Sequence, residues 1–187
     1  MTDWPTHARA SSILDEWCSN INLKRHAYAV AAAMKAYAEK LGGDPLRWEA
    51  VGLLHDFDYE KYPGREDHPY RGCAYLKEQG YARELIEGVL AHAEYTGMPR
   101  DTDLKKAIFA VDELTSLIVA VALTRPTRKI ADVTVESVLK KWNQKAFAAS
   151  VNRSEIEQGA RELGIPLEHH IGIVLRAMQG IADKLGL

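Results

Sequence analysis

Residues 45–58 read Pro-Leu-Arg-Trp-Glu-Ala-Val-Gly-Leu-Leu-His-Asp-Phe-Asp, and this stretch decides the fold that we expect. Asp44, directly before it, is a favourable helix N-cap, and Pro45 suits the first helical position. Apolar residues then follow at helical spacing. The apolar rhythm stops near Asp58, so His55 and Asp56 are expected at the C-terminal end of this helix, where two neighbouring side chains can reach one point.

The same helical periodicity recurs along most of the chain. It predicts helices over about 24–41, 45–56, 69–78, 82–94, 103–123, 134–142 and 152–163, and a last helix that contains 171–181. Asn152 with Glu155 resembles a capping box. Because no long run of strict alternation favours a strand, we predict an all-α bundle. Residues 1–130 would form the main helical domain, and residues 131–187 would add C-terminal helices packed on the same core.

The composition is that of an ordinary globular protein of 187 residues, with 47% apolar and 27% charged residues. The 24 basic and 26 acidic residues leave no basic excess, so a nucleic-acid polymer is not an expected partner. The isolated Cys18 and Cys73 fit a reducing compartment. With no secretory signal and no apolar run long enough for a bilayer, we expect a cytoplasmic protein without membrane contact.

Polar side chains occupy helix faces that should be apolar. His26 shares a stripe with Val30 and Met34, and three more residues lie on such stripes in other predicted helices: His55, His92 and Asp112. A single inward histidine is usually a hydrogen-bonded core residue. A buried carboxylate, however, costs several kcal/mol unless it is paired or binds a metal. One divalent ion would satisfy the three histidines together with Asp56 and Asp112.

The order of these residues resembles the HD-domain superfamily of metal-dependent phosphohydrolases. Residues 52–58 are similar to its "LLHDIG" segment, residues 68–72 (His-Pro-Tyr-Arg-Gly) to the "HPxxG" segment of its HDIG-type branch, and residues 110–115 to a further segment that carries Asp112. The resemblance covers roughly residues 20–130 and implies an HD-type bundle. Asp58 stands where the HDIG segment has glycine, and no Gly-Tyr-Pro motif follows His92, so a cyclic-dinucleotide phosphodiesterase is not expected.

The resemblance also implies a set of metal ligands. Four residues match the ligands of one ion: His26, His55, Asp56 and Asp112. His68 and His92 match further histidines that bind a second ion in two-metal branches. Those branches usually have another histidine where this chain has Ala93. We therefore expect one tightly bound divalent ion (Mn, Mg, Fe, Co, Ni or Zn), and leave a second ion open.

The function implied is hydrolysis of a phosphoester in a small metabolite or nucleotide by a metal-activated water. Asp56 would act at the metal, and Asp58 and Glu94 are the nearest candidates for the general base. His92 or His68 could take a proton, hold the phosphate or bind the second ion.

Several cationic residues flank the motifs: Arg25, Lys61, Arg65, Arg71, Arg125 and Arg128. Of these, Lys61 and Arg125 are the preferred phosphate ligands. The pair His169-His170 has no partner at ligand spacing and is expected at the surface.

Two other functions fit the same sequence. Some HD-domain relatives are di-iron oxygenases, which need a complete second site, and Ala93 counts against this alternative. In the other alternative the chain is a non-catalytic, metal-binding regulatory module. The helices after residue 133 could then serve a partner, or a second copy in a homo-oligomer.

Overall fold

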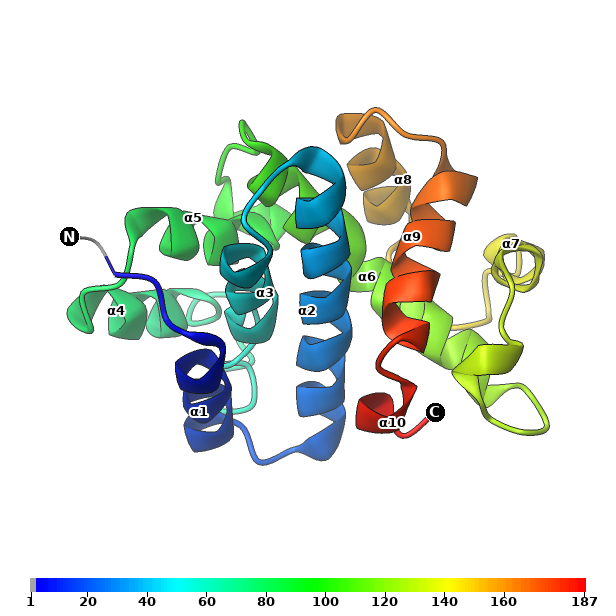
Figure 1. The fold of residues 1–187 in the computed structure, drawn as a ribbon, viewed down its shortest axis with the longest axis horizontal. Coiled ribbons are helices and arrows are strands. Elements are labelled where there is room, and N and C mark those ends of the chain that lie inside the picture. Colours follow the sequence, from blue (N-terminus) through cyan, green and yellow to red (C-terminus); the bar gives the residue numbers. More distant parts are fainter. Residues whose placement is uncertain (1–2) are drawn as a thin grey trace.

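The computed structural model describes residues 3–187, and helices make up most of them (Figure 1). The first part contains α1 (His7–Trp17), α2 (Ile21–Leu41), α3 (Pro45–Leu54), α4 (Tyr70–Glu78), α5 (Arg83–Ala91), the 3-10 helix η1 (Glu94–Thr96) and α6 (Asp103–Leu123). The second part contains the 3-10 helix η2 (Ile130–Asp132), α7 (Val135–Trp142), α8 (Arg153–Glu162), α9 (Leu167–Gln179) and α10 (Ala182–Leu185). Within residues 3–187 no strand forms beyond an isolated bridge, so the predicted all-α class is confirmed.

Local capping signals fix several helix ends as predicted. The Asp44 carboxylate accepts hydrogen bonds from the backbone N–H groups of Leu46 and Arg47, which starts α3. Gly42 ends α2 in the left-handed region with φ of 76°, a conformation that glycine adopts without strain. Helix α6 has the predicted bounds, 103–123.

Several local expectations differ from the structure. The last long helix, expected to contain 171–181, ends at Gln179, and the short α10 after it was not predicted. Helix α1 was not predicted, because only Ala10, Ile13 and Leu14 form its buried face, too few for a clear periodicity. The helix expected over 82–94 ends at Ala91. The capping box at Asn152 is absent: its amide donates to the Glu155 carboxylate at 2.6 Å and makes no cap bond.

Helix α2 is the central element of the bundle, and it packs against α3, α6, α9 and α10 through one hydrophobic core (Figure 1). Helices α2 and α3 approach most closely at Gly52, where an added Cβ would lie only 2.6 Å from the Ala31 Cα. Only a residue without a side chain permits this contact. The close approach sets the distance between α2 and the C-terminal end of α3, which carries His55.

The C-terminal helices share this core, because buried residues of α8, α9 and α10 belong to the same hydrophobic cluster as those of α2 and α6. The division of the chain at residue 130 stays a prediction. The described residues contain no helix that combines the length and the apolarity needed to cross a membrane.

His170 contradicts its predicted surface position, whereas His169 is exposed. The His170 ring is fully buried; its Nε2–H donates to the Ala110 carbonyl at 2.8 Å, and its Nδ1 accepts from the Tyr37 hydroxyl at 2.6 Å. These bonds tie α9 to α6 and α2 and need the neutral imidazole. Burial lowers the pKa of His170 to about 4.

This lowered pKa predicts pH-dependent stability. An unfolded histidine titrates near 6.5 and the folded one near 4, so the stabilisation is complete above about pH 6.5 and is lost as the pH falls toward 4. The loss is roughly 3 kcal/mol. We expect urea unfolding, followed by circular dichroism, to show that the stability difference between the protein and His170→Gln shrinks over this range. The exposed His169→Gln is the matched control, and a pH-independent difference for His170→Gln would contradict the assignment.

Candidate metal centre

The structure brings the six predicted metal ligands together from separate elements. His26 lies on α2, His55 and Asp56 directly follow α3, His68 precedes α4, His92 directly follows α5, and Asp112 lies in the middle of α6. Their ligand atoms fall into two groups of three, within each of which all ligand atoms lie within 4.8 Å of one another. The sequence had suggested a different division, with four ligands for one ion and two for another.

The first group contains His26, His55 and Asp112. The His26 Nε2 lies 3.1 Å from the His55 Nε2 and 2.9 Å from the Asp112 Oδ1. The His55 Nε2 lies 3.5 Å from the same carboxylate oxygen. Two imidazole nitrogens and one carboxylate oxygen therefore face a common point.

The second group contains Asp56, His68 and His92. The Asp56 Oδ1 lies 3.2 Å from the His68 Nε2 and 3.3 Å from the His92 Nε2. The two histidine Nε2 atoms are 3.2 Å apart. This group is complete as a three-ligand set although residue 93 is alanine.

Asp56 belongs to both groups by its position. While its Oδ1 faces His68 and His92, its Oδ2 lies 3.5 Å from the His55 Nε2 and 3.9 Å from the His26 Nε2. The end of α3 makes this possible, because the helix stops at Leu54 and the Asp56 side chain is no longer held to a helical direction. An ion held by either group would therefore have an oxygen of Asp56 close by.

Hydrogen bonds at Nδ1 orient all four rings, and at His26 the Nδ1 lies 3.3 Å from the Thr115 hydroxyl oxygen. The Nδ1–H groups of His55 and His92 donate to the Gly52 carbonyl at 2.8 Å and the Val89 carbonyl at 2.6 Å. The His68 Nδ1–H donates to the Asp58 carboxylate at 2.7 Å. Each bond leaves the Nε2 lone pair facing the centre, the arrangement that metal-binding histidines adopt. The mixed nitrogen and oxygen donors suit a first-row divalent metal.

Charges also favour a cation at this place. Burial lowers the pKa of His55, but the carboxylates of Asp56 and Asp112 outweigh it and raise the value to about 9. At His68 the carboxylates of Asp56 and Asp58 likewise outweigh burial and raise the pKa to about 9. Without a metal, protons on the imidazoles balance the carboxylates.

A divalent ion should therefore displace protons when it binds. A histidine binds metal only in its neutral form, so we expect release of about two protons per chain, from His55 and His68, near pH 7.5. Apparent metal affinity should rise with pH up to about 9, where these groups lose their protons unaided. Calorimetric titration of the metal-free protein in two buffers with different ionisation enthalpies measures the proton count, and metal binding without proton release would contradict the two pKa values.

The two predicted general bases occupy different surroundings. Asp58 is fully buried and does not line the pocket; both of its carboxylate oxygens accept hydrogen bonds. Glu94 does line the pocket, but its Oε2 forms an ion pair with the Arg100 Nη1 at 2.6 Å. The Asp58 carboxylate is therefore not free to take a proton from a water in the pocket, and the Glu94 carboxylate is held by Arg100.

The two preferred phosphate ligands lie elsewhere. The Lys61 Nζ donates to the Glu16 carbonyl at 3.3 Å and sits 4.5 Å from the centroid of the Trp17 ring. Arg125 follows the C-terminal end of α6, and neither residue lines the pocket. Arg65, named above but not preferred, does line it, with its guanidinium 5.2 Å from the centroid of the Tyr95 ring. In the sequence, the position of Arg65 in the loop that carries His68 could have indicated this.

The pocket over the two groups has a volume of about 920 Å³. Its wall includes residues that the sequence analysis did not single out as site residues: Tyr95, Glu113, Ser116, Ser150 and Glu155. Burial, and then the charge of Asp112, raises the pKa of Glu113 to about 7, and burial raises that of Glu155. Glu113 follows Asp112 directly and could have been found from that neighbour. Nothing local marks Glu155, which α8 brings to the site.

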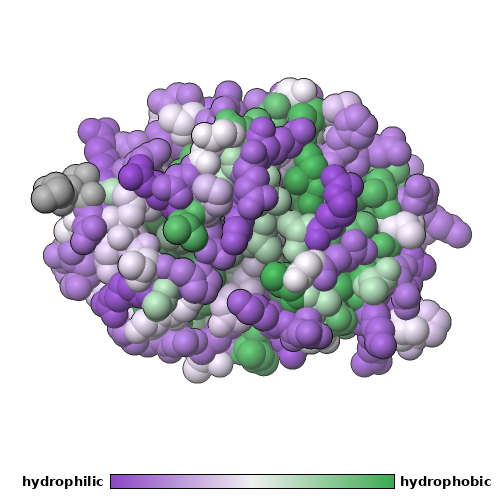
Figure 2. Space-filling view, viewed as in Figure 1, coloured by the Kyte–Doolittle hydropathy of each residue, from purple (hydrophilic) through white to green (hydrophobic). Residues whose placement is uncertain are grey.

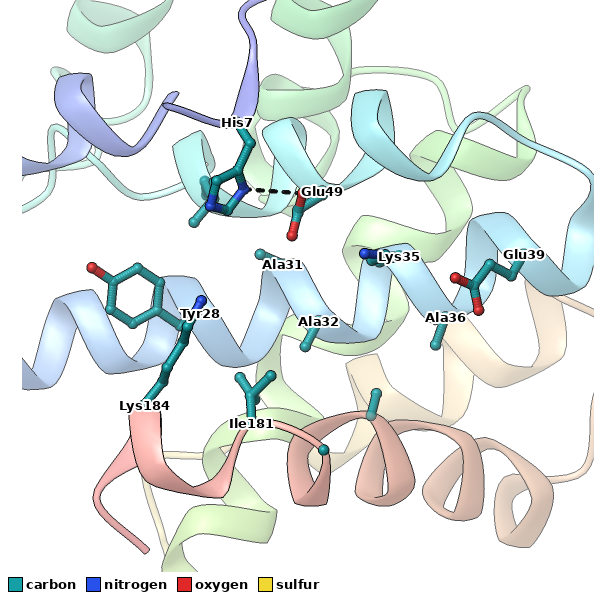
Figure 3. Close-up of a pocket in the computed structure, with 13 residues that line it drawn as sticks. His7, Tyr28, Ala31, Ala32, Lys35, Ala36, Glu39, Glu49, Ile181 and Lys184 are labelled. Atoms are coloured by element: carbon teal, nitrogen blue, oxygen red, sulfur yellow. Dashed lines mark hydrogen bonds and ion pairs between the residues drawn. The ribbon is translucent and has the colours of Figure 1, made fainter. Parts of the chain in front are cut away.

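A smaller groove of about 350 Å³ lies on another part of α2, toward α3 and α9. Ala31, Ala32 and Ala36 lie along its length, and His7 pairs with Glu49 at 3.1 Å on one side (Figure 3). Figure 2 shows hydrophobic residues exposed between polar ones on the face that carries α2 and α9. None of the six predicted ligands lines this groove, so the chemistry belongs to the other pocket.

Comparison with known proteins agrees with this geometry. A family model described as HD domain matches residues 23–117, a range that contains all six residues of the two groups. No curated protein and no solved structure was found to match the chain.

Proposed function

Because the chain belongs to the HD-domain family, we propose that it is a metal-dependent phosphohydrolase that cleaves a phosphoester of a small metabolite or nucleotide. The single observation that carries the proposal is the position of Asp56, whose two oxygens face two ligand groups on the floor of one pocket. The narrower assignment to the HDIG-type branch stays a prediction.

Two ions fit this arrangement better than the single ion expected from the sequence. His26, His55 and Asp112 would hold one ion, His68 and His92 the other, and Asp56 would contact both. Divalent ions lower the pKa of a bound water and stabilise negative charge on phosphate oxygens. The histidines, held through Nδ1, keep their Nε2 atoms in place for this role.

The charge of the pocket wall supports bound cations. Five carboxylate residues line the pocket: Asp56, Glu94, Asp112, Glu113 and Glu155. Arg65 is the one arginine or lysine among the described lining residues. Alone, this wall would repel a phosphate. With divalent cations it attracts one, and the guanidinium of Arg65 is then placed to bind a phosphate oxygen.

The experiment combines elemental analysis with a panel of phosphomonoesters and nucleotides, assayed for phosphate release with Mn, Mg, Fe, Co, Ni and Zn. We expect Asp112→Ala to lose one ion and Asp56→Ala to weaken both, because Asp56 faces both groups. Both variants should lose phosphate release and keep the helix content seen by circular dichroism.

The exposed Asp183→Ala on α10 is the matched control and should keep both metal and activity. Full metal occupancy in Asp112→Ala would show that the first group is not a ligand set. Turnover by the metal-stripped protein would overturn the proposed function.

Glu113 is the pocket acid best suited to accept the proton of the attacking water. Its carboxylate lines the pocket directly beside Asp112, accepts a hydrogen bond from the Asn152 backbone N–H at 3.1 Å, and forms no ion pair among the described residues. We expect Glu113→Gln to lower kcat on the order of 100-fold with little change in KM or metal content. The comparison variant is Glu155→Gln, which should have a small effect. A rise in kcat/KM would instead mean that Glu113 only repels the substrate.

The completeness of the second group keeps a di-iron oxygenase as the second candidate. A three-ligand set exists there without a histidine at position 93. Two irons per chain, with oxygen consumption and no phosphate release across the panel, would favour this reaction over hydrolysis.

A further inference from the structure

Asp58 is a buried carboxylate that the proposed reaction does not use directly. Its side chain is fully buried, its Oδ1 accepts a hydrogen bond from the His68 Nδ1 at 2.7 Å, and its Oδ2 accepts one from the Gly72 backbone N–H at 2.7 Å. We propose that Asp58 is a positioning residue that fixes the ring and the tautomer of His68. It thereby sets the affinity of the second ligand group (Asp56, His68 and His92) for a divalent ion. This inference rests on the proposed function, because it concerns an ion in that group.

The hydrogen bond determines which nitrogen of His68 carries the proton. An ionised carboxylate is only an acceptor, so the Nδ1 must donate and the Nε2 keeps its lone pair. That Nε2 lies 3.2 Å from both the Asp56 Oδ1 and the His92 Nε2. In the other tautomer, the Nδ1 lone pair would face the Asp58 carboxylate, which is repulsive. Asp58 therefore selects the form of His68 that can bind a metal.

Local structure explains why the Nδ1–H of His68 donates to a side chain and not to a backbone carbonyl. His55 and His92 each directly follow a helix, and each bonds the carbonyl of the residue three positions earlier. His68 lies in the irregular segment between α3 and α4 and makes no such bond. The carboxylate replaces the missing carbonyl. It also adds a negative charge, which makes the imidazole a stronger ligand.

The second bond of Asp58 anchors the carboxylate itself. Gly72 lies in the first turn of α4, where backbone N–H groups have no partner inside the helix, and Pro69 at the N-cap provides no side-chain cap. The contact is close, because a Cβ on Gly72 would lie 2.6 Å from the Phe57 ring and 3.0 Å from the Asp58 Cγ. Asp58 is thus held by two hydrogen bonds and close packing, and it links His68 to the start of α4.

The test compares Asp58→Ala and Asp58→Asn with the unmodified protein, in manganese titrations followed by calorimetry. Asp58→Ala should weaken the second ion by about 10–100-fold and leave the first within about twofold. Asparagine has one acceptor oxygen for two donors. The affinity of Asp58→Asn for the second ion should therefore lie between those of the unmodified protein and Asp58→Ala. The matched control is Asp67→Ala, beside His68 in sequence, whose half-buried carboxylate pairs with Arg71 at 2.8 Å.

A spectroscopic readout separates positioning from a purely structural role. Nitrogen-15 NMR of the metal-free protein, recorded at about pH 10, where the imidazoles are neutral, reports the tautomer of each histidine. We expect the His68 Nδ1–H form to dominate in the protein, and to lose that dominance in Asp58→Ala while His55 and His92 stay unchanged. Loss of thermal stability with an unchanged His68 tautomer and unchanged second-ion affinity would overturn the proposal. If Asp58→Ala does not fold, Asp58→Asn, which keeps the side-chain size, decides by the same two measurements.

The outcomes also separate this inference from the proposed function. Two bound ions without phosphate release from any substrate would remove the phosphohydrolase and leave the role of Asp58 testable by metal affinity. If the protein binds a single ion, and binds it equally well in Asp58→Ala, the role of Asp58 is wrong. Hydrolysis at the first group would then still stand.

Discussion

The sharing of the Asp56 carboxylate between two ligand groups is the constraint on which the rest of the site depends. One oxygen faces His68 and His92, and the other faces His55. This works only if α2, α6 and the C-terminal ends of α3 and α5 hold the ligand atoms of each group within 4.8 Å of one another. The contact between Gly52 and Ala31 removes the space that a side chain would take between α2 and α3. The absence of a side chain at Gly52 is therefore needed both for helix packing and for the positions of the candidate ligands.

The carboxylates gathered in this pocket also carry an electrostatic cost, which either protons on the histidines or bound cations can reduce. Buried carboxylates next to imidazoles hold protons on His55 and His68 in the absence of a metal, so protons and cations compete for the same place. A cation bound there also offsets the acidic wall formed by residues such as Glu113 and Glu155. The same negative charge that would repel a phosphate from the metal-free pocket would favour the binding of divalent ions.

The C-terminal helices belong to the site as well as to the core. Helix α8 brings Glu155 to the pocket, and the backbone N–H of Asn152, just before α8, donates to the Glu113 carboxylate at 3.1 Å. Buried His170 on α9 bonds the Ala110 carbonyl, two residues before Asp112. The segment beyond the family match therefore packs against α6 through α8 and α9, and contributes part of the pocket wall.

The sequence by itself determined the helical class, most helix ends and the identity of the six candidate ligands, because apolar periodicity and capping are local properties. His26, His55 and Asp112 were recognisable as polar groups on apolar stripes, and His68 through its resemblance to a family motif. The tertiary structure decided how the ligands divide into two groups, why Asp58 holds His68 and does not face the pocket, and why Arg65 lines the pocket while Lys61 and Arg125 do not. It also decided that His170 is buried. These outcomes depend on distances of about 3 Å between residues tens of positions apart. Such distances are set by how helices pack, and no local pattern of side chains encodes them.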